Sequence, residues 1–286
     1  INRTWRRTGK SEIARTDWIL EESEQHSFGH DLVVDSEKPD MRFAMTRLSA
    51  AVLFACLWGP AMVNAQNDAS KRVIEPGIHQ MTLAESGRRY TLAIPDGYTE
   101  QEPTPLILSL HYGGQVTPFY GRGLLQSLIE PALRELGAII VAPDSAAGNW
   151  ANPTSEQHVL ELLDYIQAQY NIDANKTLLT GYSMGGSGTW YLAPRYPERF
   201  RAALAMAGRP QADSTAFDWN TPMYLISSTA DEVVPLELTR IVVERLQNQG
   251  ASIEFVVVDE ITHYQIPRYA PYLGAAIPWI QHVWAE

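Results

Sequence analysis

The sequence has very little cysteine: Cys56 is the only one among 286 residues. A single thiol excludes an intramolecular disulfide and any metal centre built from several cysteines. Basic residues are also scarce, since 22 Lys and Arg stand against 33 Asp and Glu and the formal net charge is −11. Such a chain offers no basic stripe, so we expect no nucleic-acid partner. The sequence also lacks the H-E-x-x-H pattern and a phosphate-binding glycine loop, so we expect no metal and no cofactor.

Long apolar runs are missing as well. The longest, Leu48–Val63, is shorter than the roughly 20 residues that a membrane-spanning helix needs, and Gly59-Pro60 interrupts it. Two arginines precede this run, and small residues follow it at 63–65. That order of charge, apolar core and small-residue site is typical of a secretory signal peptide. The sequence therefore predicts a signal peptide at residues 41–65, a secreted or periplasmic protein, and no stable membrane insertion.

Two other interpretations of this segment stay open, a membrane anchor and a lipoprotein in which Cys56 carries the lipid. The apolar run continues past Cys56, which argues against the lipoprotein. If residues 41–65 are a signal peptide, residues 1–40 are upstream sequence outside any domain. Residues 66–286 are then long enough for a single domain with a substantial core.

Short apolar segments alternate with helical patterns along residues 90–284. We predict strands at residues 90–95, 106–111, 138–142, 177–180, 202–206, 223–226 and 253–258. Amphipathic spacing predicts helices at 155–170, with Val159 and Leu163 on the buried face, and at 236–249, with Leu238, Ile241, Val242 and Leu246 on the buried face. A last helix is expected at about 272–284. This alternation indicates an α/β fold with a mostly parallel sheet, helices on both faces, and the active site at the carboxyl ends of the strands.

The strongest motif is Gly181-Tyr182-Ser183-Met184-Gly185, which lies between a predicted strand and a helical stretch. This G-x-S-x-G pattern in this context is a nucleophile elbow, in which Ser183 sits on a tight turn. Glycine is needed two residues to either side because a β-carbon would collide with the turn. The N–H of Met184, at the start of the helix, is placed to bind a developing oxyanion.

A serine nucleophile needs a base and an acid, which follow it along the chain in the order acid, then histidine. Only His263 and His282 follow Ser183. His263 lies in a loop directly after a strand, whereas His282 falls within the last helix, so we predict that His263 is the base. Asp231 follows the preceding strand and is predicted to orient His263. Glu232 and then Asp259 are the nearest rivals for this role.

The second oxyanion donor is expected in the loop His111-Tyr112-Gly113-Gly114, which follows an early strand. The sequence does not choose between the N–H groups of Gly113 and Tyr112, and it favours a structural role for His111. Two aromatic residues are candidates for the substrate cleft, namely Trp150 and Tyr264, and packing is the alternative role for each. Trp190 is expected in the core.

Two segments resemble the bacterial α/β-hydrolases grouped with dienelactone hydrolases, prolyl-oligopeptidase-like esterases, feruloyl esterases and polyhydroxyalkanoate depolymerases. They are YNIDANKTLLTGYSMGGSGTWYLAPRYPERFRAALAMAG (170–208) and STADEVVP (228–235). The resemblance implies an α/β-hydrolase fold. Tyr112 replaces a glycine common in these families, and Tyr264 replaces a small residue. Only residues 209–221 separate two predicted strands where relatives insert a lid, so we expect no large cap domain.

These observations together predict a serine carboxylesterase that acts on a small-molecule or polymeric ester through an acyl-enzyme. A feruloyl-type esterase and a polyester depolymerase are the alternatives within the class. A serine peptidase or an acyltransferase is less favoured. A secreted binding protein without catalysis is favoured least, because all three triad positions are filled in order.

Overall fold

The computed structural model describes residues 73–286, which form one compact unit around an eight-stranded sheet. The strands are β1 (Gly77–Thr82), β2 (Arg89–Ile94), β3 (Thr104–Leu110), β4 (Ile139–Pro143), β5 (Ile172–Tyr182), β6 (Ala202–Met206), β7 (Met223–Ser228) and β8 (Ile253–Val258). Their spatial order is β1-β2-β4-β3-β5-β6-β7-β8. Strands β3 to β8 run parallel to one another, and β1 and β2 pair antiparallel. The expected α/β fold with a mostly parallel sheet is therefore confirmed.

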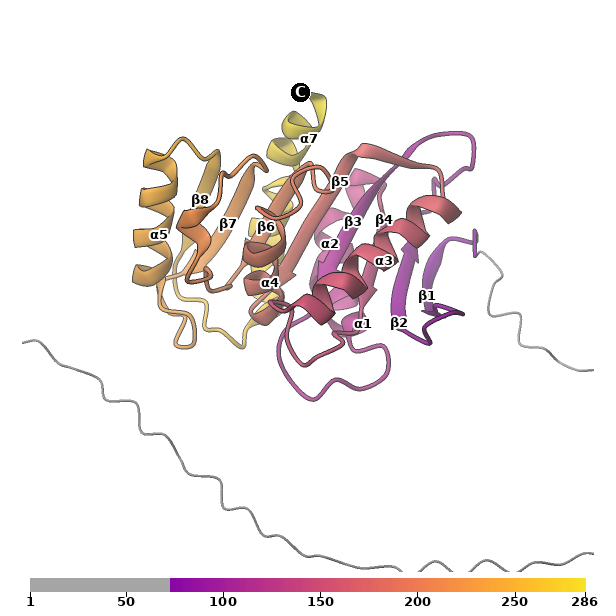
Figure 1. Ribbon diagram of the computed structural model, residues 1–286, viewed down its shortest axis with the longest axis horizontal. Coiled ribbons are helices and arrows are strands. Elements are labelled where there is room, and N and C mark those ends of the chain that lie inside the picture. The colour runs from indigo at the N-terminus through magenta and orange to yellow at the C-terminus, as the bar shows by residue number, and fades with distance from the viewer. Residues whose placement is uncertain (1–72) are drawn as a thin grey trace, which may run out of the picture. The chain divides into compact units, whose positions relative to one another are not determined.

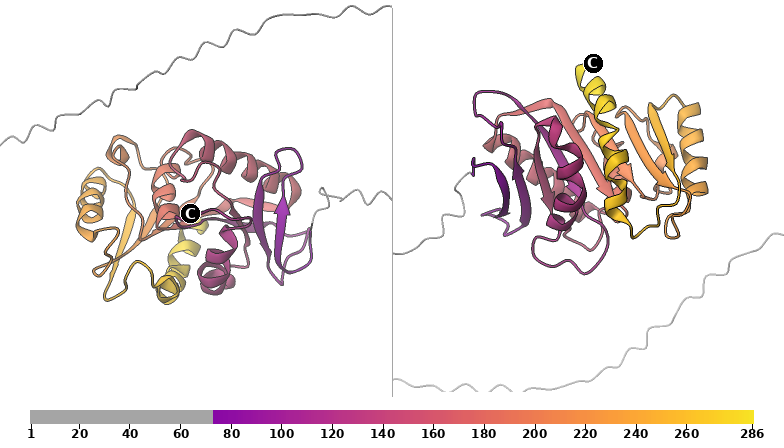
Figure 2. Two further views of the ribbon diagram at one scale, coloured as in Figure 1. Left: turned by 90° about the horizontal axis from the view of Figure 1, so that it is seen from below. Right: turned by 180° about the vertical axis from the view of Figure 1, so that it is seen from behind.

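Helices cover both faces of the sheet (Figures 1 and 2). On one face lie α3 (Pro153–Gln169), α4 (Met184–Leu192) and α5 (Leu236–Asn248). On the other lie α1 (Gly121–Leu124), a π-helical turn (Leu125–Ile129), α2 (Glu130–Leu133), a 3-10 turn (Arg134–Leu136), a 3-10 turn (Ile266–Tyr269), α6 (Ala270–Gly274) and α7 (Ile277–Ala285). Within residues 73–286, no helix is long and apolar enough to span a bilayer.

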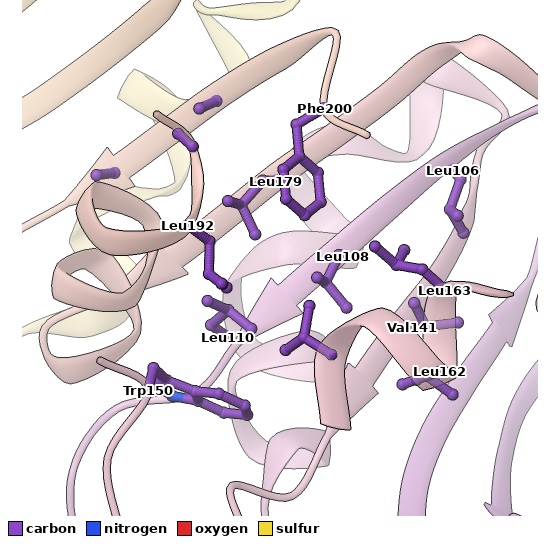
Figure 3. Packing of buried hydrophobic residues seen from close by; sticks show 14 of the residues in the cluster. Leu106, Leu108, Leu110, Val141, Trp150, Leu162, Leu163, Leu179, Leu192 and Phe200 are labelled. Carbon is purple, nitrogen blue, oxygen red and sulfur yellow. The ribbon is translucent and has the colours of Figure 1, made fainter. Parts of the chain in front are cut away.

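Successive side chains along the central strands point alternately to the two faces of the sheet. They therefore pack into two hydrophobic cores, one on each face. Leu106, Leu108 and Leu110 of β3 point toward α3 and α4, whereas Ile107 points to the opposite side. Figure 3 shows the first of these cores, in which Leu162 and Leu163 of α3 pack over the β3 leucines. Burial on both faces explains why the central strands are almost continuously apolar.

Two helix predictions need correction. The expected last helix at 272–284 is broken into α6 and α7, because Gly274 ends one and Pro278, which lacks an N–H, lies in the first turn of the other. In α5, Leu238 and Ile241 are 53% and 48% exposed. Leu246 is fully buried as predicted, and Val242 packs partly buried against the core. Thr239 and Val243 complete the buried face in place of Leu238 and Ile241.

The remaining helix predictions hold. In α3, Val159 and Leu163 are fully buried as expected, and Asn152 caps the helix by accepting a hydrogen bond from Ser155 N at 2.9 Å. The connection between β6 and β7 contains one 3-10 turn, Ser214–Ala216, and no cap domain. Within the part of the chain that the structure describes, no cap therefore covers the carboxyl ends of the strands beside Ser183. The predicted signal peptide at 41–65 lies outside the described residues.

Candidate active site

Ser183 lies at the junction of β5 and α4 with φ 54° and ψ −115°, a conformation that L-residues rarely adopt. The flanking glycines make this turn possible. A β-carbon on Gly181 would lie 2.3 Å from the Gly185 carbonyl, and one on Gly185 would lie 1.9 Å from the carbonyl oxygen of Leu110. The steric reason given for the motif is therefore confirmed, and the turn presents the Ser183 side chain at the carboxyl end of the sheet.

His263 lies in the loop after β8, the strand at the edge of the sheet, and this loop brings it to Ser183 past β6 and β7. Its Nε2 is 2.7 Å from Ser183 Oγ, which is hydrogen-bonding distance for a base that takes a proton from a hydroxyl. The histidine is 5% exposed. The other histidine after the elbow, His282, is on the surface of α7, 3.3 Å from the Glu286 carboxylate, and lies away from this site.

Asp231 follows β7 and lies 2.9 Å (Oδ2) and 3.0 Å (Oδ1) from His263 Nδ1. The N–H groups of Val233 and Val234 also donate to its Oδ1. Burial by itself would raise the pKa of Asp231, but the hydrogen bonds from His263, Val234 and Val233 outweigh it and hold the pKa below its usual value. The carboxylate is therefore charged and positioned to keep the proton of the imidazole on Nδ1.

The backbone of His263 is held from both sides. Its N–H donates to Glu232 Oε2 at 3.0 Å, and its carbonyl accepts from the Tyr182 hydroxyl at 2.7 Å. Glu232, which the sequence offered as a rival acid, thus contacts the backbone of the histidine and not its ring. Asp259, the other rival, accepts from Thr229 Oγ1 at 3.1 Å. Tyr182 was missed because G-x-S-x-G leaves its second position open.

Gly113 and Met184, two of the residues predicted to donate to the oxyanion, lie side by side. A β-carbon built on Gly113 would be 3.8 Å from Met184 Cβ, so the loop after β3 approaches the first residue of α4. Among residues 73–286, the N–H groups of Tyr112, Gly113 and Met184 have no hydrogen-bond acceptor. Unpaired N–H groups near a serine side chain are the arrangement that an oxyanion requires.

A surface cavity of about 400 Å³ lies beside Ser183 and His263. It is lined by Tyr112, Gly113, Tyr182, Ser183, Val233, His263, Tyr264 and Ile266. Tyr264 lies at the edge of the cavity and is 76% exposed. Its ring contacts that of His263, with the ring centroids 5.6 Å apart. The cavity is thus small and open, and Tyr264 stands where the sequence predicted a cleft residue. The ring of Tyr182 is buried behind it.

Trp150, the other cleft candidate, does not line this cavity. It is 1% exposed, its Nε1 donates to the carbonyl of His111 at 2.9 Å, and its ring packs against Gly188 of α4. The loop after β4 folds inward, so the prediction of a cleft wall is wrong and the packing alternative is right. Trp190 lies in the core as expected, 1% exposed and 5.3 Å from the ring of Trp219.

The residues that the structure describes contain no cluster of three or more His, Cys, Asp or Glu side chains able to hold a metal ion. The groups gathered around the cavity are instead a hydroxyl, an imidazole, a carboxylate and unpaired amides. These are the parts of acyl-transfer chemistry by a serine nucleophile.

Comparison with known proteins agrees with this class. Residues 83–239 match the protein family Esterase, whose description is "Putative esterase", and the chain belongs to that family. It is an α/β-hydrolase that resembles feruloyl esterases. Feruloyl esterase C of Emericella nidulans is 27% identical over 157 residues, covering 51% of this chain and 54% of the relative. Feruloyl esterase D of Neurospora crassa is 25% identical over 222 residues, covering 71% of this chain and 70% of the relative.

The chain spans between 49% and 61% of the length of three relatives that it matches, one named feruloyl esterase C and two named probable feruloyl esterase C. Among solved structures, a thermostable esterase superposes with a TM-score of 0.61 at 22% identity, covering 72% of this chain and 62% of the other. At that identity the likeness shows the fold alone.

Proposed function

We propose that this chain is a secreted or periplasmic carboxylic-ester hydrolase with a Ser183–His263–Asp231 catalytic triad. The observation that carries the proposal is the continuous hydrogen-bonded line from Ser183 Oγ through His263 to Asp231, with distances of 2.7 and 2.9 Å. Secretion rests on the signal-peptide pattern at 41–65, and the catalytic domain is then residues 66–286.

In this mechanism His263 Nε2 takes the proton of Ser183 as its oxygen attacks the ester carbonyl. Met184 N–H, with Gly113 or Tyr112, stabilises the tetrahedral oxyanion. His263 then protonates the leaving alcohol and afterwards activates a water that hydrolyses the acyl-enzyme. Asp231 keeps the imidazole in the tautomer that presents Nε2 to the serine and stabilises the imidazolium.

Feruloyl-type esters are the favoured substrates within this class. The relatives named feruloyl esterase support this choice, and the exposed ring of Tyr264 at the cavity offers a flat apolar face to an aromatic acyl group. Polyester depolymerase, serine peptidase and acyltransferase activities remain the alternatives. The open cavity and the short β6–β7 connection suit a bulky or polymeric ester, because no cap restricts access.

The test is hydrolysis of p-nitrophenyl esters from acetate to laurate, together with a ferulate ester, by wild type and Ser183→Ala. We expect the variant to lose activity by about a thousandfold or more. A fluorophosphonate probe is expected to label wild type and not the variant. A folded wild type that hydrolyses no ester and resists the probe would contradict the proposal and favour a binding protein.

A further inference from the structure

His111 is a fully buried histidine that the triad does not use. It follows β3 directly, and its Nε2 accepts a hydrogen bond from the backbone N–H of Ser145 at 3.0 Å. A backbone N–H can only donate, so Nε2 carries a lone pair and the ring proton is on Nδ1. Nδ1 lies 2.7 Å from the carbonyl oxygen of Tyr112, to which it therefore donates. The hydrogen bonds fix the tautomer of the ring.

The ring is also fixed in orientation. The rings of Tyr120 and Trp150 pack edge-on against it, with centroids 4.8 and 4.9 Å away. The carbonyl of His111 itself accepts from Trp150 Nε1. Burial lowers the pKa of His111, although the hydrogen bond to the Tyr112 carbonyl opposes this. The ring therefore stays neutral, as an accepting Nε2 requires.

The bond to the Tyr112 carbonyl determines where the next N–H points. In a trans peptide the C=O and the N–H point in opposite directions, and the plane moves as a unit. Because His111 draws the Tyr112 carbonyl into the interior, the N–H of Gly113 is turned outward. The Tyr120 hydroxyl holds the following carbonyl, that of Gly113, at 3.2 Å. The two peptide planes that flank the Gly113 Cα are thus both held by hydrogen bonds, and together they fix the direction of the Gly113 N–H.

Gly113 lies beside Met184. A β-carbon built on Gly113 would lie 3.8 Å from Met184 Cβ, so Gly113 lies against the Met184 side chain. The side chain of Tyr112 instead reaches toward α1, where its hydroxyl would be 3.1 Å from a β-carbon on Gly123. An oxyanion bound by Met184 N–H therefore has the Gly113 N–H as its neighbour.

We propose that His111 is a positioning residue that orients the Gly113 N–H as the second oxyanion donor. The inference rests on the proposed ester hydrolysis at Ser183. His111 takes no part in proton transfer, since its ring is enclosed and both its nitrogens are engaged. It acts through the peptide plane between Tyr112 and Gly113, which it holds in the orientation that the transition state needs.

The experiment compares His111→Asn with His111→Leu, two side chains of nearly equal size. Asparagine can place an amide N–H near the position of Nδ1, whereas leucine has no donor. We expect His111→Leu to lower kcat by about 10- to 100-fold with KM within about twofold, less than the loss of a whole oxyanion donor. His111→Asn should recover most of that loss. Inhibition by a trifluoromethyl ketone, whose adduct carries the oxyanion, should weaken in parallel with kcat/KM.

Wild-type kcat in His111→Leu, equal losses in both variants, or a loss confined to KM would overturn the proposal. If His111→Leu does not fold, ¹⁵N NMR of histidine-labelled wild type carries the test. The His111 signal, identified by its absence in His111→Asn, must be that of a neutral ring protonated on Nδ1, and protonation on Nε2 overturns the proposal. Ser183→Ala, run in the same assay, separates the two ideas, because activity there within about tenfold of wild type refutes the proposed function whatever the His111 variants do.

Discussion

The hydroxyl of Tyr182 donates a 2.7 Å hydrogen bond to the backbone carbonyl of His263. Tyr182 precedes the nucleophile in the chain, and His263 is 81 residues further on. The bond is buried, and burial raises the pKa of the Tyr182 phenol far above its usual value, so the hydroxyl keeps its proton and remains a donor. The residue next to Ser183 thus holds the loop that carries the proposed base, His263.

Replacing this hydroxyl tests how tightly the base must be held. We expect Tyr182→Phe to lower the free energy of unfolding by about 1–3 kcal/mol, because a buried carbonyl loses its donor. Looser placement of the base should also lower kcat by about tenfold. Tyr170→Phe is the matched control, because Tyr170 donates a similar 3.0 Å bond to the carbonyl of Val73 away from the site. If both variants lost kcat equally, the Tyr182 bond would have no special place in catalysis.

The choice of acid is tested by amide variants. Asp231→Asn removes the charge beside His263 and favours the wrong tautomer, so we expect kcat to fall on the order of 10³- to 10⁴-fold. Asp259→Asn should change kcat by less than about twofold, since Asp259 contacts Thr229 and not the imidazole. A loss in Asp259→Asn as large as that in Asp231→Asn would mean that the acid is wrongly assigned.

Stability should fall in acid in two pH ranges. Burial depresses the pKa of His111 below the ordinary 6.5, so below about pH 6.5 the unfolded chain binds a proton that the folded chain does not. Stability is therefore lost as the pH falls from 6.5 toward the lower folded pKa. The pKa of Asp231 is also lowered, so a second loss is expected below its ordinary 3.8.

Chemical unfolding of wild type and His111→Asn between pH 4 and 8 measures the first of these losses. We expect the wild type to lose stability below about pH 6.5 and the variant to lack that component of the slope. Equal slopes in the two proteins would mean that His111 is not the group responsible.

The elbow glycines give a steric prediction. Gly185→Ala places a β-carbon 1.9 Å from the backbone oxygen of Leu110, which cannot move without shifting β3. We expect a loss of more than about 3 kcal/mol in unfolding free energy, or no folded protein. Gly97→Ala is the control, since a β-carbon there meets nothing within 4 Å. Thermal unfolding compares the two, and a wild-type midpoint for Gly185→Ala would contradict the close approach of β3 and α4.

The corrected face of α5 is tested by substitutions on both sides of the helix. Leu238→Lys and Ile241→Lys should change the free energy of unfolding by no more than about 0.5 kcal/mol, because both side chains are half exposed. Leu246→Ala should cost about 2–5 kcal/mol, because Leu246 is fully buried. Urea unfolding distinguishes the faces, and a large loss in Leu238→Lys would restore the original prediction.

The parts of the fold that the sequence predicts well are those with a strong local pattern. The buried strands and α3 were recognisable because burial on two faces, or on one helix face, leaves a regular apolar spacing. Strand β1 was missed because it is a half-exposed edge strand that pairs with β2 alone. In α5 the apolar residues outnumber the positions that the sheet can cover, so periodicity alone placed Leu238 and Ile241 on the wrong side.

The candidate site likewise has residues that the sequence predicts and residues that it does not. Ser183, His263 and Asp231 could be named because strand ends and chain order constrain them, and the structure brings these three side chains together. The contacts of Tyr182 and Glu232 with the His263 backbone depend on the paths of separate loops, which no local pattern encodes. Trp150 was misplaced for the same reason, since nothing in Gly148-Asn149-Trp150 says that the loop turns inward.

The positive φ of Ser183 lowers the stability of the folded protein. Glycine adopts such a backbone more readily than any L-residue, so Ser183→Gly would relieve strain on the order of 1 kcal/mol while removing the nucleophile. Selection for stability alone would favour glycine at this position, and the site would then lose its serine hydroxyl. Under the proposed function, the chemistry of the Ser183 hydroxyl is what offsets this strain, so catalysis and stability favour different residues at position 183.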